Sequence, residues 1–154
     1  MTAMEYEVVA LEEKVIAGVS ARTRNDAPDM QQVIGGLWSD FYGKGIYAAV
    51  AGKKNGKAIG LYSDYESGAS GAYDVTVACE VAADEPQREG VIKKVIPAGH
   101  YARFVVKGDM VQAVAVFWGE LWNMDLDRAY TGDFEEYQDN EACATIHIYI
   151  ALKG

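Results

Sequence analysis

An internal duplication constrains the fold of this chain more than any other feature of its sequence. Apolar residues recur at helical spacing over residues 30–41 and again over 111–122, and Trp38 and Trp118 hold matching places 80 residues apart (118 − 38). This spacing predicts two amphipathic helices. Two strand-like runs precede each apolar stripe and two follow it, so we predict the order strand–strand–helix–strand–strand twice.

The strand-like runs predict an antiparallel sheet. Residues 72–81 alternate apolar and other side chains, which is the pattern of a strand, and residues 52–57 form a predicted glycine-rich turn. The fold class is therefore α+β, a duplicated layout with one helix per half, two helices in all, on an antiparallel sheet. We expect one domain over residues 1–154, with half-repeats of about 4–82 and 91–153.

The seam between the two halves is where we expect a ligand. A cleft between half-domains is a common place for a small molecule, and the alternative is a duplicated scaffold whose seam is filled by side chains. At the seam, the repeat equates Tyr62 with Phe134, which lie 72 residues apart (134 − 62).

Composition narrows the classes of partner. The chain has 154 residues and a net charge of −9, so its overall field repels phosphate, which argues against nucleic acid and favours cations. Cys79 and Cys143 lie in or beside apolar runs without a CxxC pair, so we read them as reduced core thiols. Without a signal-peptide pattern or an apolar run of about 20 residues, we expect a cytoplasmic protein that does not enter a membrane.

Three stretches carry a more specific signal: GLYSDYE at 60–66, FEEY at 134–137 and TIHIYIAL at 145–152. Together they resemble the GyrI-like superfamily, the small-molecule effector-binding domain that is also fused to AraC-type and MerR-type regulators. The chain is most similar to the stand-alone, integron-cassette-associated effector-binding proteins of that superfamily. The resemblance implies duplicated βαββ modules in pseudo-twofold symmetry, with a central ligand groove between them. It also implies an acidic residue among aromatic rings at the centre of that groove. By the motif match that acid is Glu135, whereas His147 stands where the family often has another acid.

These residues suggest a site for amphipathic, cationic aromatic compounds. A carboxylate among rings is costly unless it is paired, burial raises its pKa, and ring faces attract an organic cation. Tyr149 alternates away from the isoleucines of its own run, so we expect it to face the ligand. For the tryptophans, plain core packing is the alternative. The candidate ligand-binding residues are Glu135, Phe134, Tyr137, Tyr149, Trp38, Trp118, Trp122, Tyr62 and Glu66.

Other functions stay open at this point. The chain has no Ser-His-Asp set, P-loop, GxGxxG or metal-spaced His/Cys set, so we expect no cofactor, no metal and a binding module rather than an enzyme. Some GyrI-like proteins hydrolyse strained cyclopropane-type compounds, and by that resemblance Glu135 would be the base and Tyr137 or Tyr149 a hydrogen-bond donor. A gyrase-inhibitor-like protein interaction is the third class.

DNA binding is expected to be indirect. Both predicted helices already belong to the repeat, which leaves none for a helix-turn-helix, so the chain is not itself a DNA-reading regulator. A separately encoded regulator or a DNA-handling enzyme is the partner class that the sequence leaves open, next to the small-molecule ligand itself.

Overall fold

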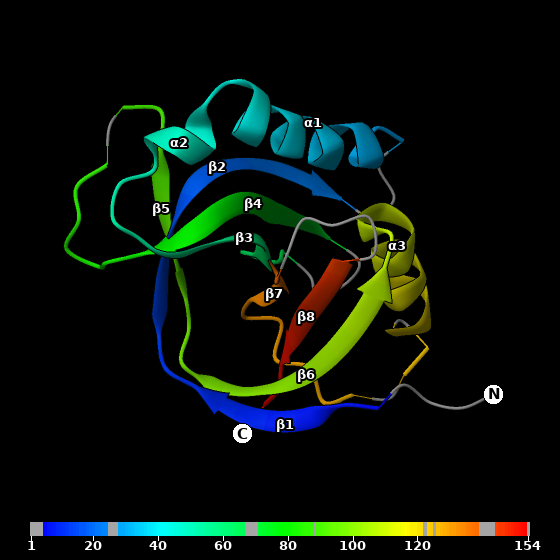
Figure 1. Cartoon of the computed structure of the whole chain (residues 1–154). Coiled ribbons are helices and arrows are strands. Elements are labelled where there is room, and N and C mark those ends of the chain that lie inside the picture. The colour runs from blue at the N-terminus through cyan, green and yellow to red at the C-terminus, as the bar shows by residue number, and fades with distance from the viewer. Residues whose placement is uncertain are drawn as a thin grey trace.

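The computed structural model describes residues 5–24, 28–66, 71–87, 89–121, 123–124, 126–138 and 144–153 (Figure 1). Eight strands form one antiparallel sheet in the order β1-β6-β8-β7-β3-β4-β2-β5. The strands are β1 (Glu7–Leu11), β2 (Lys14–Arg24), β3 (Lys53–Ser63), β4 (Ala72–Val81), β5 (Ile92–Ile96), β6 (Gly99–Gly108), β7 (Asp133–Tyr137) and β8 (Ala144–Ala151). The helices are α1 (Met30–Gly43), α2 (Ile46–Ala49) and α3 (Met110–Leu121).

The strand order confirms the duplicated α+β architecture. Exchanging β1 with β5, β2 with β6, β3 with β7 and β4 with β8 gives the same order read backwards. The first strand of each half pairs with a strand of the other half: β1 pairs with β6, and β5 pairs with β2. The two halves meet where β3 pairs with β7, so this pair of strands lies at the pseudo-dyad.

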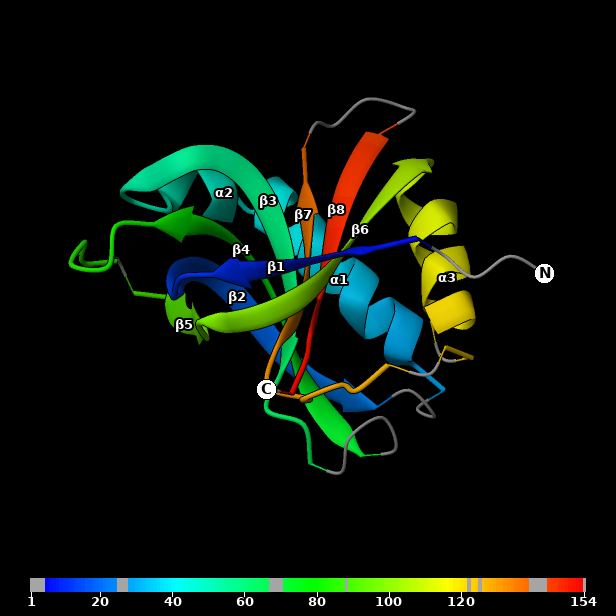
Figure 2. The same cartoon turned by 90° about the horizontal axis from the view of Figure 1, so that it is seen from below.

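Apolar side chains cover both faces of the sheet. On one face, Leu37 and Phe41 of α1 pack over β4, and Phe117 and Leu121 of α3 pack over β6 and β8. Figure 2 shows α1 behind the sheet and α3 beside it. On the other face, strands from both halves share a second core that contains Ile16, Ile59, Leu61, Ile96, Tyr101, Phe134 and Tyr149. Every central strand is therefore buried on two sides.

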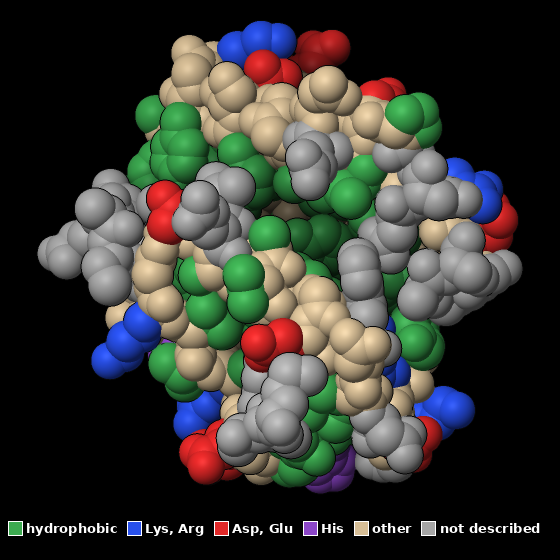
Figure 3. All heavy atoms as spheres, turned by 90° about the vertical axis from the view of Figure 1, so that its right-hand side faces the viewer, with side chains coloured by type: hydrophobic (Ala, Val, Ile, Leu, Met, Phe, Trp, Pro, Cys, Tyr) green, Lys and Arg blue, Asp and Glu red, His purple; other side chains and the backbone are tan. Residues whose placement is uncertain are grey.

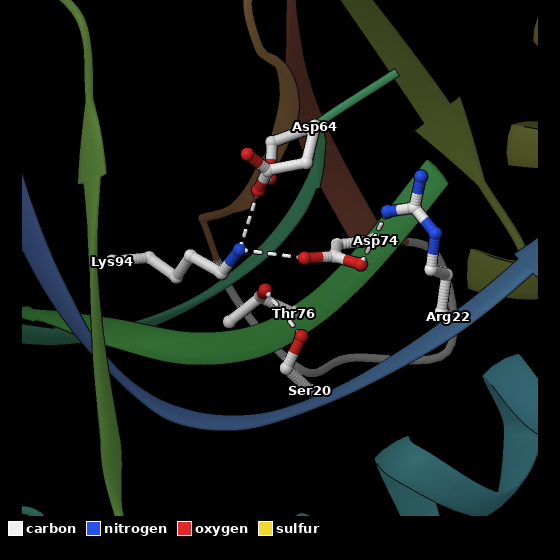
Figure 4. A network of polar contacts seen from close by, with 7 residues as sticks. Ser20, Arg22, Asp64, Asp74, Thr76 and Lys94 are labelled. Carbon is white, nitrogen blue, oxygen red and sulfur yellow. Dashed lines mark hydrogen bonds and ion pairs between the residues drawn. The ribbon is translucent and has the colours of Figure 1, made fainter. Parts of the chain in front are cut away.

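An ion-pair network ties the exchanged strand β5 to the first half (Figure 4). Lys94 of β5 lies 2.8 Å from a carboxylate oxygen of Asp74 on β4 and 2.5 Å from one of Asp64, and Arg22 of β2 lies 2.9 Å from Asp74. The hydrogen bond from Lys94 lowers the pKa of Asp64. These groups are partly exposed, so each pair adds little to stability, and their geometry mainly fixes the register of β5.

Several local expectations differ from the structure. The predicted turn at residues 52–57 is wrong, because residues 53–57 belong to β3. This strand pairs with β4 at Lys53 and again from Ala58 onwards, with a shift in register between the two positions. The short helix α2 follows α1 where Gly45, at φ 73°, turns the chain in the left-handed conformation that glycine adopts easily. Cys79 is a free, buried thiol as expected, and Cys143 lies outside the described residues. Within the described ranges, no helix has the length and apolar character needed to span a bilayer.

The repeat offset of 72 at the seam is wrong, because it equates two side chains on opposite faces of the sheet. Leu61 is the direct partner of Phe134, and both belong to the core on the face away from the helices. Tyr62 packs instead with the core under α1. Because a shift of one residue moves a side chain to the other face of a sheet, Tyr62 and Phe134 cannot be symmetry-related.

Candidate functional site

Glu135 lies at the middle of β7 with its side chain on the face that carries the helices. The alternation of a strand puts Asp133, Glu135 and Tyr137 on this face and Phe134 and Glu136 on the opposite one. Glu135 is only 1% exposed. It is directly opposite Gly60 of β3 in the sheet. A Cβ atom at position 60 would lie 3.2 Å from Oε1 of Glu135, so the glycine leaves the space that the carboxylate occupies.

Three side chains donate hydrogen bonds to this buried carboxylate. The Tyr62 hydroxyl lies 3.0 Å and the Trp118 indole Nε1 2.8 Å from Oε2, and the Tyr137 hydroxyl lies 2.9 Å from Oε1. The donors come from β3, α3 and β7, so residues of both halves hold Glu135. All three donors are neutral, and they fix the orientation of the carboxylate without cancelling its charge.

Aromatic rings stand around the carboxylate in two edge-to-face pairs. Trp38 of α1 packs against Tyr137 with ring centres 5.0 Å apart, and Trp118 of α3 packs against Tyr62 at 5.3 Å. Each of the four rings is partly exposed, whereas Glu135 is not. The rings therefore lie between the carboxylate and solvent. On the side of the molecule where α3 lies, Figure 3 shows a recess whose visible walls are mostly hydrophobic side chains.

Burial raises the pKa of Glu135, and the three hydrogen bonds oppose that rise only in part. Burial, together with the nearby carboxylate, also raises the pKa of Tyr62 and of Tyr137, so both hydroxyls keep the protons that they donate. Among the described residues, no lysine or arginine forms an ion pair with Glu135. The site thus holds a carboxylate whose hydrogen bonds are made and whose charge is not neutralised.

A second buried acid, Asp133, lies on the same face of β7 and was missed from the sequence. It is fully buried and accepts hydrogen bonds from Arg128 Nη2 at 2.7 Å, the Tyr65 hydroxyl at 2.6 Å and the backbone N–H of Ala151 at 2.8 Å. The spacing of two residues from Glu135 was the available signal, because alternate residues of a strand share a face. Unlike Glu135, Asp133 has an arginine as its counter-ion.

Two predicted site residues lie on the other face of the sheet. Phe134 and Tyr149 stack on each other with ring centres 4.5 Å apart and belong to the core shared by both halves. Tyr149 does alternate away from the isoleucines of β8, but the face that it reaches is a second core. It therefore does not lie beside Glu135, where a donor to a base would have to be.

The remaining predicted residues divide as follows. Tyr62, Tyr137, Trp38 and Trp118 come together around Glu135, as described above. Glu66 is exposed beyond the end of β3, where its backbone N–H donates to the carbonyl of Ala72. Trp122 lies outside the described residues.

Comparison with known proteins agrees with this architecture. The family model of the integron-associated effector binding protein matches residues 7–152. The Bacillus subtilis (strain 168) protein YobU, by its name a candidate transcriptional regulator, is 32% identical over 155 residues, covering 95% of this chain and 96% of YobU. An integron cassette protein from the mobile metagenome of Vibrio cholerae has a similar crystal structure, with a TM-score of 0.78 and 31% identity over 96% of this chain and 95% of that one.

A more distant structure has the same fold with a molecule bound. The protein SAV2435, solved in complex with tetraphenylphosphonium, superposes with a TM-score of 0.81 at 20% identity, over 98% of this chain and 95% of that one. At this identity the likeness concerns the fold.

Proposed function

The chain belongs to the integron-associated effector-binding protein family, and from this premise we propose that it binds amphipathic aromatic cations beside Glu135, between α1 and α3. The observation that carries the proposal is the state of the Glu135 carboxylate. It is 1% exposed and hydrogen-bonded only to neutral donors, and no cationic side chain among the described residues pairs with it. A cation brought by a ligand would supply the missing counter-charge in a place where water screens poorly.

The rings around Glu135 favour an organic cation over an inorganic one. A cation over the face of a tryptophan or tyrosine gains roughly 0.5–2 kcal/mol per good contact, and flat ligand rings gain further by packing against aromatic side chains. Trp38, Tyr62, Trp118 and Tyr137 offer such faces and are all partly exposed. The complex of SAV2435 with tetraphenylphosphonium, a lipophilic cation with four phenyl rings, is consistent with this ligand class.

The hydrogen bonds of Glu135 favour a charge partner over a catalytic base. An ionised carboxylate has about four acceptor positions, and three of those of Glu135 are occupied by Tyr62, Trp118 and Tyr137. A general base for hydrolysis must direct a free lone pair at a water molecule, and the three donors leave about one acceptor position for this. Of the two tyrosines considered as donors for hydrolysis, Tyr149 belongs to the core on the other face of the sheet and Tyr137 already donates to Glu135.

The test compares a cation with a neutral molecule of nearly the same shape. We would titrate the protein with methyltriphenylphosphonium and with triphenylphosphine oxide, following tryptophan fluorescence, and repeat both titrations with Glu135→Gln. The substitution should weaken binding of the phosphonium about 10-fold or more, which is about 1.4 kcal/mol, and change that of the oxide little. Equal losses for both ligands would refute the role of the charge, and mass spectrometry of the recovered ligands would reveal any turnover.

Gln fits the site and keeps the number of hydrogen bonds at three, with the bond to Tyr137 reversed in direction. Its carbonyl oxygen can accept from Tyr62 and Trp118 in place of Oε2, and its NH2 group can donate to the Tyr137 hydroxyl, since a tyrosine hydroxyl also accepts. The variant therefore removes the charge and keeps the shape and the hydrogen-bond count. A matched control is Glu136→Gln, which removes a neighbouring charge on the opposite face of β7.

A further inference from the structure

Arg128, next to the Glu135 site, has a buried N–H group without a hydrogen-bond partner. The side chain of Arg128 is 10% exposed, and its Nη2 donates to Asp133 at 2.7 Å. Its Nε is buried and, within the described part of the chain, meets no acceptor. Buried polar groups in folded proteins are almost always hydrogen-bonded, so an exception requires an explanation.

The position of Arg128 links it to the aromatic site. Its guanidinium carbon lies 6.0 Å from the ring centre of Trp118, the residue whose indole N–H donates to Glu135. Its ion-pair partner Asp133 is two residues before Glu135 on the same face of β7, a separation of roughly 7 Å along a strand. The guanidinium and the Glu135 carboxylate are thus both neighbours of the Trp118 indole.

Tyr130 covers the guanidinium from another side, with its ring centre 4.3 Å away. Its φ of 55° is in the left-handed region, which a bulky residue adopts at a cost. Such strained residues persist where the surrounding structure holds them and are frequent at ligand sites. The ring of Tyr130 also packs edge-on against Tyr65, with centres 5.6 Å apart, and Tyr65 donates to Asp133.

The Nε–H is the buried donor that Arg128 can offer a ligand. Asp133 already accepts from Arg128, Tyr65 and the backbone of Ala151, so the Arg128–Asp133 pair is neutral and its carboxylate is occupied. Together with Glu135, these described residues carry a net charge of −1, which matches a ligand with a single positive charge. An anionic arm on that ligand would be repelled by two carboxylates, so the partner of Nε–H is a neutral acceptor.

We propose that Arg128 determines specificity at this site: the ligand is a monovalent aromatic cation that also carries a neutral hydrogen-bond acceptor, such as a carbonyl oxygen, for the Nε–H of Arg128. This inference rests on the proposed function and adds to it. Glu135 selects the charge of the ligand, and Arg128 selects among cations of equal charge and size.

The test uses two phosphonium ions that differ in one group. In (4-oxopentyl)triphenylphosphonium a ketone oxygen takes the place of a methyl group of (4-methylpentyl)triphenylphosphonium, and both ions carry one charge. The wild-type protein should bind the ketone at least about 5-fold more tightly, because a hydrogen bond to a charged donor outweighs the desolvation of a ketone. Equal binding, or weaker binding of the ketone, would overturn the inference without any variant.

Arg128→Lys then assigns the preference to the Arg128 guanidinium. Lysine keeps the positive charge for Asp133 and has no N–H group at the Nε position, so the ratio of the two affinities should fall towards 1. The matched control, Arg22→Lys, alters an arginine of an ion pair with Asp74 elsewhere on the sheet and should keep the wild-type ratio. A preference for the ketone that persists in Arg128→Lys would refute the role of Arg128.

The outcomes separate this inference from the proposed function. If neither phosphonium binds, both are wrong. If both bind equally well to the wild-type protein and Glu135→Gln weakens both, the proposed function stands and the acceptor inference fails. Melting temperatures of the variants show whether a change in the affinity ratio accompanies a loss of folding.

Discussion

Removal of the Tyr137 hydroxyl should destabilise the protein in a pH-dependent way. In Tyr137→Phe, Oε1 of Glu135 loses its donor at 2.9 Å, while the ring can still pack against Trp38. A hydrogen bond to a charged group contributes about 1.5–3 kcal/mol. For a domain of this size that corresponds to a fall in melting temperature of roughly 3–12 °C at neutral pH.

The sign of the pH dependence follows from the raised pKa of Glu135. Burial places it above the ordinary value of 4.5, so the folded protein holds a proton that the unfolded chain has released. The contribution of this group to stability is therefore fully present below pH 4.5 and is lost as the pH rises through the folded pKa. Because the lost hydrogen bond stabilises the charged form, Tyr137→Phe raises that pKa further. The difference from wild type should then grow between acidic and neutral pH.

Urea unfolding of both proteins at a series of pH values measures this difference. The control is Tyr42→Phe, because Tyr42 is 53% exposed, stacks on Trp38 and is not among the described donors to Glu135. It should change stability little at any pH. If Tyr137→Phe costs the same free energy at acidic and at neutral pH, the hydroxyl does not stabilise a charged Glu135, and the electrostatic description of the site is wrong.

Two further substitutions test the surroundings of the site. Asp133→Asn should cost about 3–5 kcal/mol in urea unfolding, because it leaves the buried Arg128 charge without its counter-ion. Trp118→Ala should cost about 3–5 kcal/mol as well, since the indole packs into the core under α3. A Trp118→Ala protein that keeps its melting temperature and loses phosphonium binding would mean that the indole serves the ligand and not the core.

The duplication and the helices could be predicted because they leave local patterns in the sequence. The apolar stripes of α1 and α3 are evident from spacing alone, and Trp38 and Trp118 hold equivalent places beside the site. The exchange of β1 and β5 between the halves could not be read in this way, since strand pairing depends on contacts far apart along the chain.

The errors at the site have one physical cause. Alternation along β7 and β8 separates the side chains into two sets and does not say which set meets the ligand. In many sheets one face is solvated, and a polar or aromatic set then indicates that face. Here both faces are buried, so Tyr149 and Phe134 fill a second core, whereas Glu135 and Tyr137 turn to the helices. Glu135 was proposed through its motif, and Asp133, outside that motif, was not.

The pH dependence of cation binding tests the central claim most directly. Methyltriphenylphosphonium keeps its charge at every pH, so between acidic and neutral pH its affinity should follow the ionisation of Glu135. We predict that the affinity of the wild-type protein falls as the pH drops through the raised pKa of Glu135, and that Glu135→Gln binds more weakly with little dependence on pH. Parallel pH profiles for the two proteins would contradict the account, because the titrating group that governs binding would then not be Glu135.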